Sequence, residues 1–521
     1  MISISNIPDE FNMGAYILDR HLDEGRGEKV AILYKDKKIT YREVAEAANR
    51  VGNALMELGV EQENRVMICL PDCPEFIYSY FGAMRIGAVP VPVSTMSTVQ
   101  DLRYYLNDSR SKVLVTTSEL APKFKEIQQE LKYLRHFIVL GPAEVGQIGF
   151  EKMMEKASAS LKIASTSKDD MAFWLYSSGT TGTPKGVVHL HHDVLHLVPP
   201  YKESLSLTEE DIIYSLSKMY FSYGNNNSLV VPFFCGAAAV LEPEMPTPEK
   251  LFEIITKYKP TVFYGVPTSF GGMLKHLEKT NAKYDLSSIR ICMASGEALP
   301  KPTFDRWKEI FGIEIQNQLG STDVGSAYIS TTHGRMKPGS IGLLLSGFEA
   351  RLLDDDENEV SKGETGTLWI KNDGTTPYYW NKHEKSKESI RGEWFDTGDK
   401  FYQDEDGYYW FKGRKDDLIK AGGIWLSPLE VEAALLEHPA VMECAVVGAP
   451  DKDNLQKPEA YVVLRENYNP SPQLEGELQE FIRSKIAHYK YPRQIHFVEE
   501  LPRTSTGKIQ RFKLRKLPQD S

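Results

Sequence analysis

Several features of secreted, membrane and metal-binding proteins are missing from this sequence. Its longest strongly apolar stretch, "LVVPFFCGAAAVL", covers residues 229–241, which is shorter than the roughly 20 residues of a membrane-spanning helix. The opening "MISISNIPDEFNMG" lacks a basic region followed by an apolar core, so we expect no secretory signal. The five cysteines are odd in number and include no CxxC pair, which indicates buried thiols. These absences predict a cytoplasmic protein without a membrane span.

The charge balance disfavours a further class of function. The chain carries 61 Lys and Arg against 72 Asp and Glu, a net charge of −11. Such an acidic chain is not typical of a general nucleic-acid-binding protein. Its 521 residues are too many for one simple core and predict two or more domains. No internal repeat or low-complexity tract is visible.

Helix-like and strand-like segments alternate through the first half of the chain. "ITYREVAEAANRVGNALMELGV" has apolar residues at helical spacing, and "RVMICL", "AVPVPV" and "KVLVTT" are typical of buried strands. The fold class is therefore predicted to be α/β, with stacked layers built on mostly parallel sheets. After about residue 335 the segments "EARLLDDDENEVSKGETGTLWIK" and "GYYWFKGRKDD" favour antiparallel strands in a barrel-like subdomain.

A domain boundary is predicted at "KGRKDDLIKAGG", residues 412–423, which has no apolar period. We expect an N-terminal domain over residues 1–413 and a compact α+β domain over residues 414–521. Helical ("SPLEVEAALLEHP") and strand-like ("PEAYVVLR") segments fill the second domain. Ligands often bind between two such parts.

The loop "YSSGTTGTPKG", residues 176–186, follows the apolar run "MAFWLY" and suits phosphate binding. Glycines let the backbone approach a ligand, hydroxyls donate hydrogen bonds, and a lysine adds positive charge. The candidate phosphate ligands are Ser177, Ser178, Gly179, Thr180, Thr181, Gly182, Thr183 and Lys185. A flexible surface turn is the alternative. A Walker loop is disfavoured because Gly186, not Ser or Thr, follows the lysine.

The loop string resembles the signature of the adenylate-forming superfamily, the acyl-CoA synthetases and their relatives. Further motifs that resemble this family follow in order: "ASGEALP", "QNQLGSTD", "WFDTGDK", "GRKDDLIKAGG" and "RTSTGKIQR". Within the family, "FNMGAYILDRHLDEGRGEKVAI" and "KMYFSYGNNNSLVVPFFCGAAAVL" are most similar to the benzoate-CoA ligase group. The resemblance covers essentially the whole chain.

The resemblance implies a two-step reaction with ATP, Mg²⁺ and coenzyme A. A carboxylate attacks the α-phosphate of ATP to give acyl-AMP and pyrophosphate, and the CoA thiol then gives acyl-CoA and AMP. The first step joins two anions, so positive charge has to gather where they meet. The implied partners are a small carboxylic acid, ATP and CoA, with no nucleic acid, in a monomer or homodimer.

The resemblance also implies a role for each matched residue. Lys508, in a Gly-containing loop, would serve adenylation; Thr322 would bond a phosphate oxygen and Asp323 would hold Mg²⁺. Asp323 stands where the family usually has Glu, one methylene longer. The implied ATP and AMP contacts, beyond the phosphate loop, are Ser295, Gly296, Glu297, Ala298, Gln318, Leu319, Gly320, Ser321, Thr322, Asp399, Phe411 and Arg414. Asp416 would be the hinge, and Gly422 and Gly423 would line the CoA tunnel.

The expected acyl pocket determines which acid is bound. By position it comprises Phe221, Ser222, Tyr223, Gly320, Val324, Ser326 and Ala327. Aromatic and small apolar walls suit an uncharged ring or chain. "KMYFSYGNNN" contains no carboxylate to pair with an α-amine, which argues against amino-acid substrates. Ser326 and Ala327 are smaller than the residues usual in benzoate-CoA ligases, which favours a roomier or more polar pocket.

Three alternatives stay open. The substrate could be a medium-chain or branched short-chain fatty acid, or the enzyme could load a carrier-protein thiol. A nucleotide-binding regulator without catalysis is the third. The histidines of "HLHH" (His189, His191 and His192) could suggest a metal site, but the phosphate-loop match already explains this region.

Overall fold

The computed structural model of the chain describes residues 4–177, 184–296, 299–332, 335–415, 417, 419–421, 424–450, 456–486, 490–503 and 509–515. The chain divides into two compact units. The first comprises Met1–Glu349 and Lys371–Phe395, and the second comprises Ala350–Ile370 and Asp396–Ser521. The predicted boundary after residue 413 stays a prediction.

The first unit contains two sheets that are mainly parallel, as predicted. The smaller has the strand order β4 (Val89–Pro92), β3 (Arg65–Cys69), β5 (Val113–Thr117), β6 (His136–Leu140) and β7 (Ile148–Gly149). All of its pairings are parallel. Its central strands are apolar and buried on both faces, which is typical of a covered parallel sheet.

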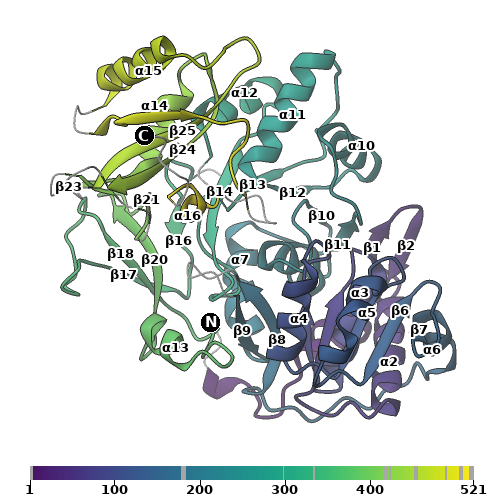
Figure 1. Cartoon of the computed structure of the whole chain (residues 1–521). Coiled ribbons are helices and arrows are strands. Elements are labelled where there is room, and N and C mark those ends of the chain that lie inside the picture. The colour runs from purple at the N-terminus through teal and green to yellow at the C-terminus, as the bar shows by residue number, and fades with distance from the viewer. Residues whose placement is uncertain are drawn as a thin grey trace. The chain divides into compact units, whose positions relative to one another are not determined.

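The larger sheet has nine strands. Their order is β16 (Leu343–Leu344), β15 (Ala327–Ser330), β14 (Ile315–Gly320), β13 (Ile291–Ala294), β12 (Val262–Gly265), β10 (Ile212–Ser215), β11 (Ala238–Leu241), β1 (Val30–Tyr34) and β2 (Lys37–Thr40). The neighbouring strands from β14 to β1 pair in parallel. At one edge β15 pairs antiparallel with β14 and with β16, and at the other edge β2 pairs antiparallel with β1. Figure 1 shows helices α10, α11 and α12 beside this sheet.

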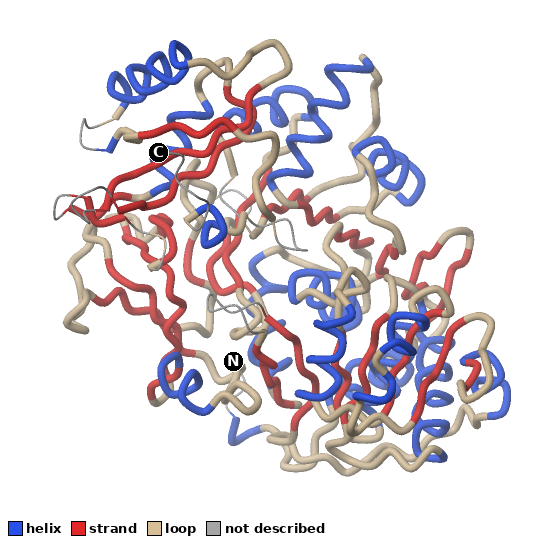
Figure 2. Tube along the Cα trace, viewed as in Figure 1, coloured by secondary structure: helices blue, strands red, loops and turns tan. Residues whose placement is uncertain are grey.

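Helices and strands alternate along most of the first unit, and Figure 2 shows them in blue and red. The helices are α1 (Met13–Asp23), α2 (Tyr41–Glu57), α3 (Pro74–Arg85), α4 (Val99–Asp108), α5 (Ala121–Glu126), α6 (Phe150–Lys156), α7 (Asp193–Ser204), α8 (Ser222–Gly224), α9 (Val231–Cys235), α10 (Pro248–Tyr258), α11 (Pro267–Thr280), α12 (Lys301–Phe311) and α13 (His383–Ser389). Short 3₁₀ turns lie at Ile4–Asn6 and Gln128–Glu130, and Asn225–Val230 is a π-helix.

Local sequence explains where these helices begin. Thr40 and Glu43 form a capping box at α2, so two backbone N–H groups are satisfied at its start. Thr247 accepts from the backbone of Lys250 at the start of α10, and Pro248 follows it. The apolar stripe of α2, including Val44, is buried as its spacing predicts.

Two further features of the first unit bear on the sequence predictions. The strands β8 (Met171–Ser177) and β9 (Lys185–Leu190) form an antiparallel hairpin around the phosphate loop. All five cysteines are buried and unpaired, as predicted. None of the helices that the structure describes is both long and apolar enough to cross a membrane.

The described residues of the second unit form strands and the helices α14 (Pro428–Leu436), α15 (Pro472–Lys485) and α16 (Arg511–Leu514). Strands β17 (Glu349–Leu353), β18 (Gly366–Lys371), β20 (Trp394–Gln403) and β21 (Tyr409–Arg414) belong to one sheet, in which β20 pairs antiparallel with β21. Strand β19 (Ile390–Arg391) of the same sheet falls in the first unit and pairs antiparallel with the start of β20, at Trp394 and Phe395. The other strands of the second unit are β22 (Ile419–Ala421), β23 (Ile424–Leu426), β24 (Val441–Pro450), β25 (Gln456–Leu464) and β26 (Gln494–Phe497).

Candidate active site

The phosphate loop joins two antiparallel strands. Ser177 at the end of β8 lies opposite Lys185 at the start of β9. Predicted ligands Ser178, Gly179, Thr180, Thr181, Gly182 and Thr183 lie outside the described residues. A Walker loop leads from a strand into a helix, whereas this loop returns into strand β9. The hairpin therefore supports the distinction from P-loop NTPases.

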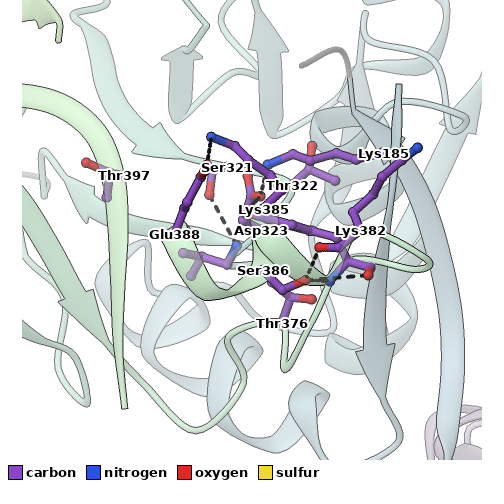
Figure 3. Close-up of polar contacts among 12 residues, drawn as sticks. Lys185, Ser321, Thr322, Asp323, Thr376, Lys382, Lys385, Ser386, Glu388 and Thr397 are labelled. Carbon is purple, nitrogen blue, oxygen red and sulfur yellow. Dashed lines mark hydrogen bonds and ion pairs between the residues drawn. The ribbon is translucent and has the colours of Figure 1, made fainter. Parts of the chain in front are cut away.

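Lys185 and Asp323 meet although 138 positions separate them. The Lys185 ammonium donates to Asp323 Oδ1 at 2.8 Å, and the hydroxyl of Tyr379 donates to the same oxygen at 2.7 Å. The ammonium also lies 3.7 Å from the centre of the Tyr379 ring, within cation–π distance. Figure 3 shows Lys185, Thr322 and Asp323 close together. The loop lysine and the predicted metal ligand thus share one site.

The Asp323 carboxylate is kept in its ionised form. Burial by itself would raise its pKa, but the charge and hydrogen bond of Lys185 and the hydrogen bond of Tyr379 lower the pKa overall. Mg²⁺ commonly takes one or two protein carboxylates and completes its shell with water and phosphate oxygens. An ionised Asp323 beside the phosphate-loop lysine fits such a site, even though Asp is shorter than Glu.

The loop that carries Asp323 runs from the end of β14 to β15 and is held by several contacts. The hydroxyl of Thr322 donates to Ser222 Oγ at 3.0 Å. The Asp323 carbonyl accepts from the backbone N–H of Thr376 at 2.8 Å. Ser321 Oγ accepts from the backbone N–H of Val324 at 3.1 Å, closing a turn. This loop therefore presents Thr322 and Asp323 on a supported backbone.

The predicted adenine-side residues lie on neighbouring strands β13 and β14. Ser295 follows β13 and donates to the Gln318 carbonyl on β14 at 3.2 Å. The Gln318 side chain in turn accepts from the hydroxyl of Tyr201 at 2.8 Å. Gly296 has a positive φ of +95°, where glycine is favoured. The structure thus places Ser295, Gly296, Gln318, Leu319, Gly320 and Ser321 along two adjacent strand ends. Glu297 and Ala298 lie outside the described residues.

The predicted acyl-pocket residues come from two segments. Phe221, Ser222 and Tyr223 precede the π-helix, and Val324, Ser326 and Ala327 follow the Asp323 loop. Asn226 of the π-helix donates to Ser326 Oγ at 3.4 Å, which joins the segments. A Cβ on Gly320 would lie 2.8 Å from the Ser326 carbonyl oxygen, so a side chain there would clash with the same segment. π-helical turns occur frequently at functional sites.

Next to these residues lies a small cavity of about 20 Å³. Its polar lining residues are Asp193, Ser222, Asn225 and Asn226, and apolar side chains such as Leu197 contribute most of the rest. This volume holds about one water molecule. The cavity is therefore too small to be the space for a carboxylic acid.

In the second unit, the predicted ribose-side residues form one cluster on paired strands. Asp399 on β20 lies opposite Arg414 on β21, and their side chains form an ion pair at 2.9 Å. The ring of Phe411 packs against Phe401 with centroids 5.2 Å apart. Lys508, Asp416, Gly422 and Gly423 lie outside the described residues, so their roles stay predictions.

The histidines of "HLHH" have partners other than a metal. His189 bonds Asp193 and the Thr322 carbonyl, His191 Nδ1 accepts from the backbone of Met13, and His192 lies 3.4 Å from Asp169. Within the described ranges, no group of three or more His, Cys, Asp or Glu side chains could hold a metal ion. The sequence interpretation overlooked Asp193, which directly follows this segment.

Two contacts of Asp323 were also missed. Thr376 and Tyr379 come from "TTPYYW", far along the chain, and no motif singled them out. An unremarkable Thr or Tyr carries no local signal of the residue that it will contact.

Models of two families match this chain. The model described as AMP-binding enzyme matches residues 18–380, and the model described as AMP-binding enzyme C-terminal domain matches residues 430–508. The chain belongs to the AMP-binding enzyme family. The resemblance stated from the motifs is thereby confirmed.

Individual relatives refine the match to this family. A benzoate–CoA ligase of Thauera aromatica is 40% identical over 98% of this chain and 96% of its own length. A 4-hydroxybenzoate–CoA/benzoate–CoA ligase of Rhodopseudomonas palustris is 37% identical over 98% of this chain and 94% of its own length. The crystal structure of an anthranilate–CoA ligase in complex with anthranoyl-AMP superposes with a TM-score of 0.91, at 38% identity and 98% coverage of both chains. The expected α/β fold and the expected similarity to the benzoate-CoA ligase group are confirmed.

Proposed function

We propose that this protein is an AMP-forming carboxylate–CoA ligase that acts on a benzoate-like aromatic or cyclic acid. The observation that carries the proposal is the junction of Lys185 and Asp323 at 2.8 Å. It brings the phosphate-loop lysine to the carboxylate expected to hold magnesium. Full-length identity of 40% to a benzoate–CoA ligase supports the same reaction class.

The first half-reaction needs positive charge near the ATP phosphates, because a carboxylate anion has to attack a phosphate anion. We assign phosphate binding to Lys185 and the hydroxyls of the loop 177–183, with Thr322 beside them. When bound at Asp323, Mg²⁺ would neutralise further phosphate charge. The carboxylate oxygen attacks the α-phosphorus, the bond to the bridging oxygen breaks, and pyrophosphate leaves.

The second half-reaction transfers the acyl group to sulfur. The CoA thiolate attacks the acyl carbon of acyl-AMP, and AMP leaves with the electrons of the C–O bond. We assign ribose binding to Asp399 and Arg414, adenylation to Lys508, the hinge to Asp416 and the CoA tunnel to Gly422 and Gly423. These assignments rest on the motifs.

The residues of the expected acyl pocket determine which acid fits. Ser326, Ala327 and Asn226 make one side of the expected acyl pocket polar and small, which favours a substituted or non-planar ring beside benzoate itself. A medium-chain or branched short-chain acid, and a carrier-protein thiol in place of CoA, stay as alternatives. A cytoplasmic location and a monomer or homodimer stay predictions.

Pyrophosphate release with and without CoA tests the proposal. We expect release with benzoate, hydroxy- or aminobenzoates, or cyclohexane- and cyclohexenecarboxylates, and kcat/KM for the best ring acid at least about tenfold above that for fatty acids. AMP should appear with CoA and not with a carrier protein. Preference for a fatty acid would overturn the substrate class, and no pyrophosphate with any acid would favour the nucleotide-binding regulator.

A further inference from the structure

His189 connects the phosphate-loop hairpin to the loop that carries Asp323. It lies on β9, four residues after Lys185, and its side chain is fully buried. Its Nδ1 lies 2.9 Å from Asp193 Oδ2, and its Nε2 lies 2.8 Å from the Thr322 carbonyl oxygen. Each ring nitrogen therefore lies within hydrogen-bond distance of an oxygen, one from a carboxylate and one from a backbone carbonyl.

The surrounding groups fix the orientation of this ring. Asp193 Oδ2 also accepts from the backbone N–H of Leu190 at 3.0 Å, which anchors the carboxylate at the start of α7. The imidazole stacks on the Phe173 ring at 4.9 Å between centroids, with an interplanar angle of 17°. His192 Nδ1 lies 3.4 Å from the other Asp193 oxygen. A histidine held by a carboxylate has one preferred direction for its second nitrogen.

The Asp323 loop is shaped to receive the ring. Gly325 has φ of +81°, and its N–H donates to the Ser321 carbonyl at 2.9 Å. A Cβ at Gly325 would lie 2.8 Å from His189 Cε1. The absence of a side chain at residue 325 therefore allows the ring to reach the Thr322 carbonyl.

We propose that His189, oriented by Asp193, is a positioning residue that sets Thr322 and Asp323 for magnesium and ATP phosphate. It acts through the backbone of Thr322, one residue from the Asp323 carboxylate. Packing alone does not require this residue, since a phenylalanine could stack on Phe173 equally well. The two polar contacts at opposite ends of the ring are what a phenylalanine cannot make. The inference rests on the proposed function.

The test compares three variants of the full-length protein. His189→Phe keeps the stacked ring without donors, His189→Gln keeps one polar end, and Asp193→Asn keeps the shape of the residue that orients the ring. The matched control is His196→Phe. His196 is also a buried histidine, but it lies on α7 and its Nε2 has no hydrogen-bond partner within the described structure.

Two kinds of readout separate positioning from folding. The affinity for Mn²⁺·ATP is measured directly by water-proton relaxation, without turnover. The Mg²⁺ dependence of pyrophosphate release and the rate of thioester formation from supplied acyl-adenylate are measured beside it, with the melting temperature as the measure of folding.

We expect His189→Phe and Asp193→Asn to weaken Mn²⁺·ATP binding about 5- to 20-fold and to raise the Mg²⁺ requirement for adenylation similarly. The rate of thioester formation should stay within about twofold of that of the parent protein. The Mn²⁺·ATP affinity of His189→Gln should lie between that of His189→Phe and that of the parent. Unchanged Mn²⁺·ATP affinity in folded variants, or equal loss in His196→Phe, would overturn the proposal. If His189→Phe does not fold, Asp193→Asn and His189→Gln decide. A parent protein that binds Mn²⁺·ATP but releases no pyrophosphate would overturn the proposed function and leave the binding test of His189 intact.

Discussion

At the residue scale, Asp323 brings together side chains that are far apart in the sequence. Both Lys185, which precedes Asp323 in the sequence, and Tyr379, which follows it, donate to its Oδ1. A largely buried ion pair is sensitive to the loss of one partner, because the remaining charge stays desolvated. The hydrogen bond from the Tyr379 hydroxyl therefore stabilises the ionised carboxylate in the folded protein and also fixes its position.

Substitution of Tyr379 tests this contribution. Tyr379→Phe removes the donated hydrogen bond but keeps the ring beside the Lys185 ammonium. We expect a loss of about 1.5–3 kcal/mol in the free energy of unfolding, the range for a hydrogen bond to a charged group. Urea unfolding measures it, with Tyr378→Phe as control because Tyr378 is 37% exposed. Equal effects of the two substitutions would contradict the assignment.

Motifs predicted some of these residues and not others. Lys185 was predicted because it lies in a loop whose composition suits phosphate binding, and Asp323 because its motif resembles that of the family. His189 was noticed, but its role depends on the Thr322 carbonyl, which is 133 positions away. No sequence motif predicted Tyr379, because its hydroxyl reaches Asp323 only when the chain folds.

At the scale of elements, two buried histidines fix helix α1. His21 on α1 lies 2.6 Å from the Phe233 carbonyl through Nε2, and His191 Nδ1 accepts from the N–H of Met13 at 3.0 Å. Burial lowers the pKa of His21 to about 4 and the pKa of His191 to about 3. Both rings are therefore neutral in the folded state at neutral pH.

This burial predicts how stability depends on pH. An unfolded histidine takes up a proton below about pH 6.5, whereas the folded ones do so only near their lowered pKa, so the free energy of unfolding falls as the pH falls. Between about pH 7 and about pH 5 we expect each histidine to lower the free energy of unfolding by about 1–2 kcal/mol. His21→Gln should flatten this decline in urea unfolding, and His136→Gln, at a partly exposed position, should not. An unchanged slope in His21→Gln would refute the explanation.

Elements were predicted where the local pattern decides them. Continuous apolar runs became parallel strands, and the stripe of "YREVAEAANRVGNALME" became α2. The π-helix at Asn225–Val230 was not predicted, because no characteristic amino-acid composition marks the backbone hydrogen-bond spacing of a π-helix. All three of its asparagines are buried, so tertiary contacts such as that to Ser326 stabilise it.

At the scale of the whole molecule, the two compact units carry different parts of the expected chemistry. Lys185 and Asp323 belong to the first unit, and Asp399 and Arg414 belong to the second. We propose that the predicted C-terminal domain, residues 414–521, brings Lys508 to the carboxylate during adenylation and moves about Asp416 for thioester formation. Such alternation would let one chain carry out two half-reactions.

Lys508→Ala tests this division of work. We expect acyl-adenylate formation to fall about 100-fold or more, because the lysine's charge is needed where two anions meet. Thioester formation from supplied acyl-adenylate should stay near the parent rate. Separate assays of the two half-reactions measure both, with the exposed Lys513→Ala as control. Equal loss of both would contradict two poses.

The sequence by itself determined the α/β class, the order of motifs and the family, because buried runs, glycine loops and phosphate-binding strings are local patterns. Tertiary structure alone decided that Tyr379 joins Lys185 at Asp323, that Asn226 reaches Ser326, and that His189 holds the Thr322 carbonyl. Each of these contacts joins segments at least 56 positions apart. Such pairings form only when the sheets and helices pack, so no window of sequence contains them.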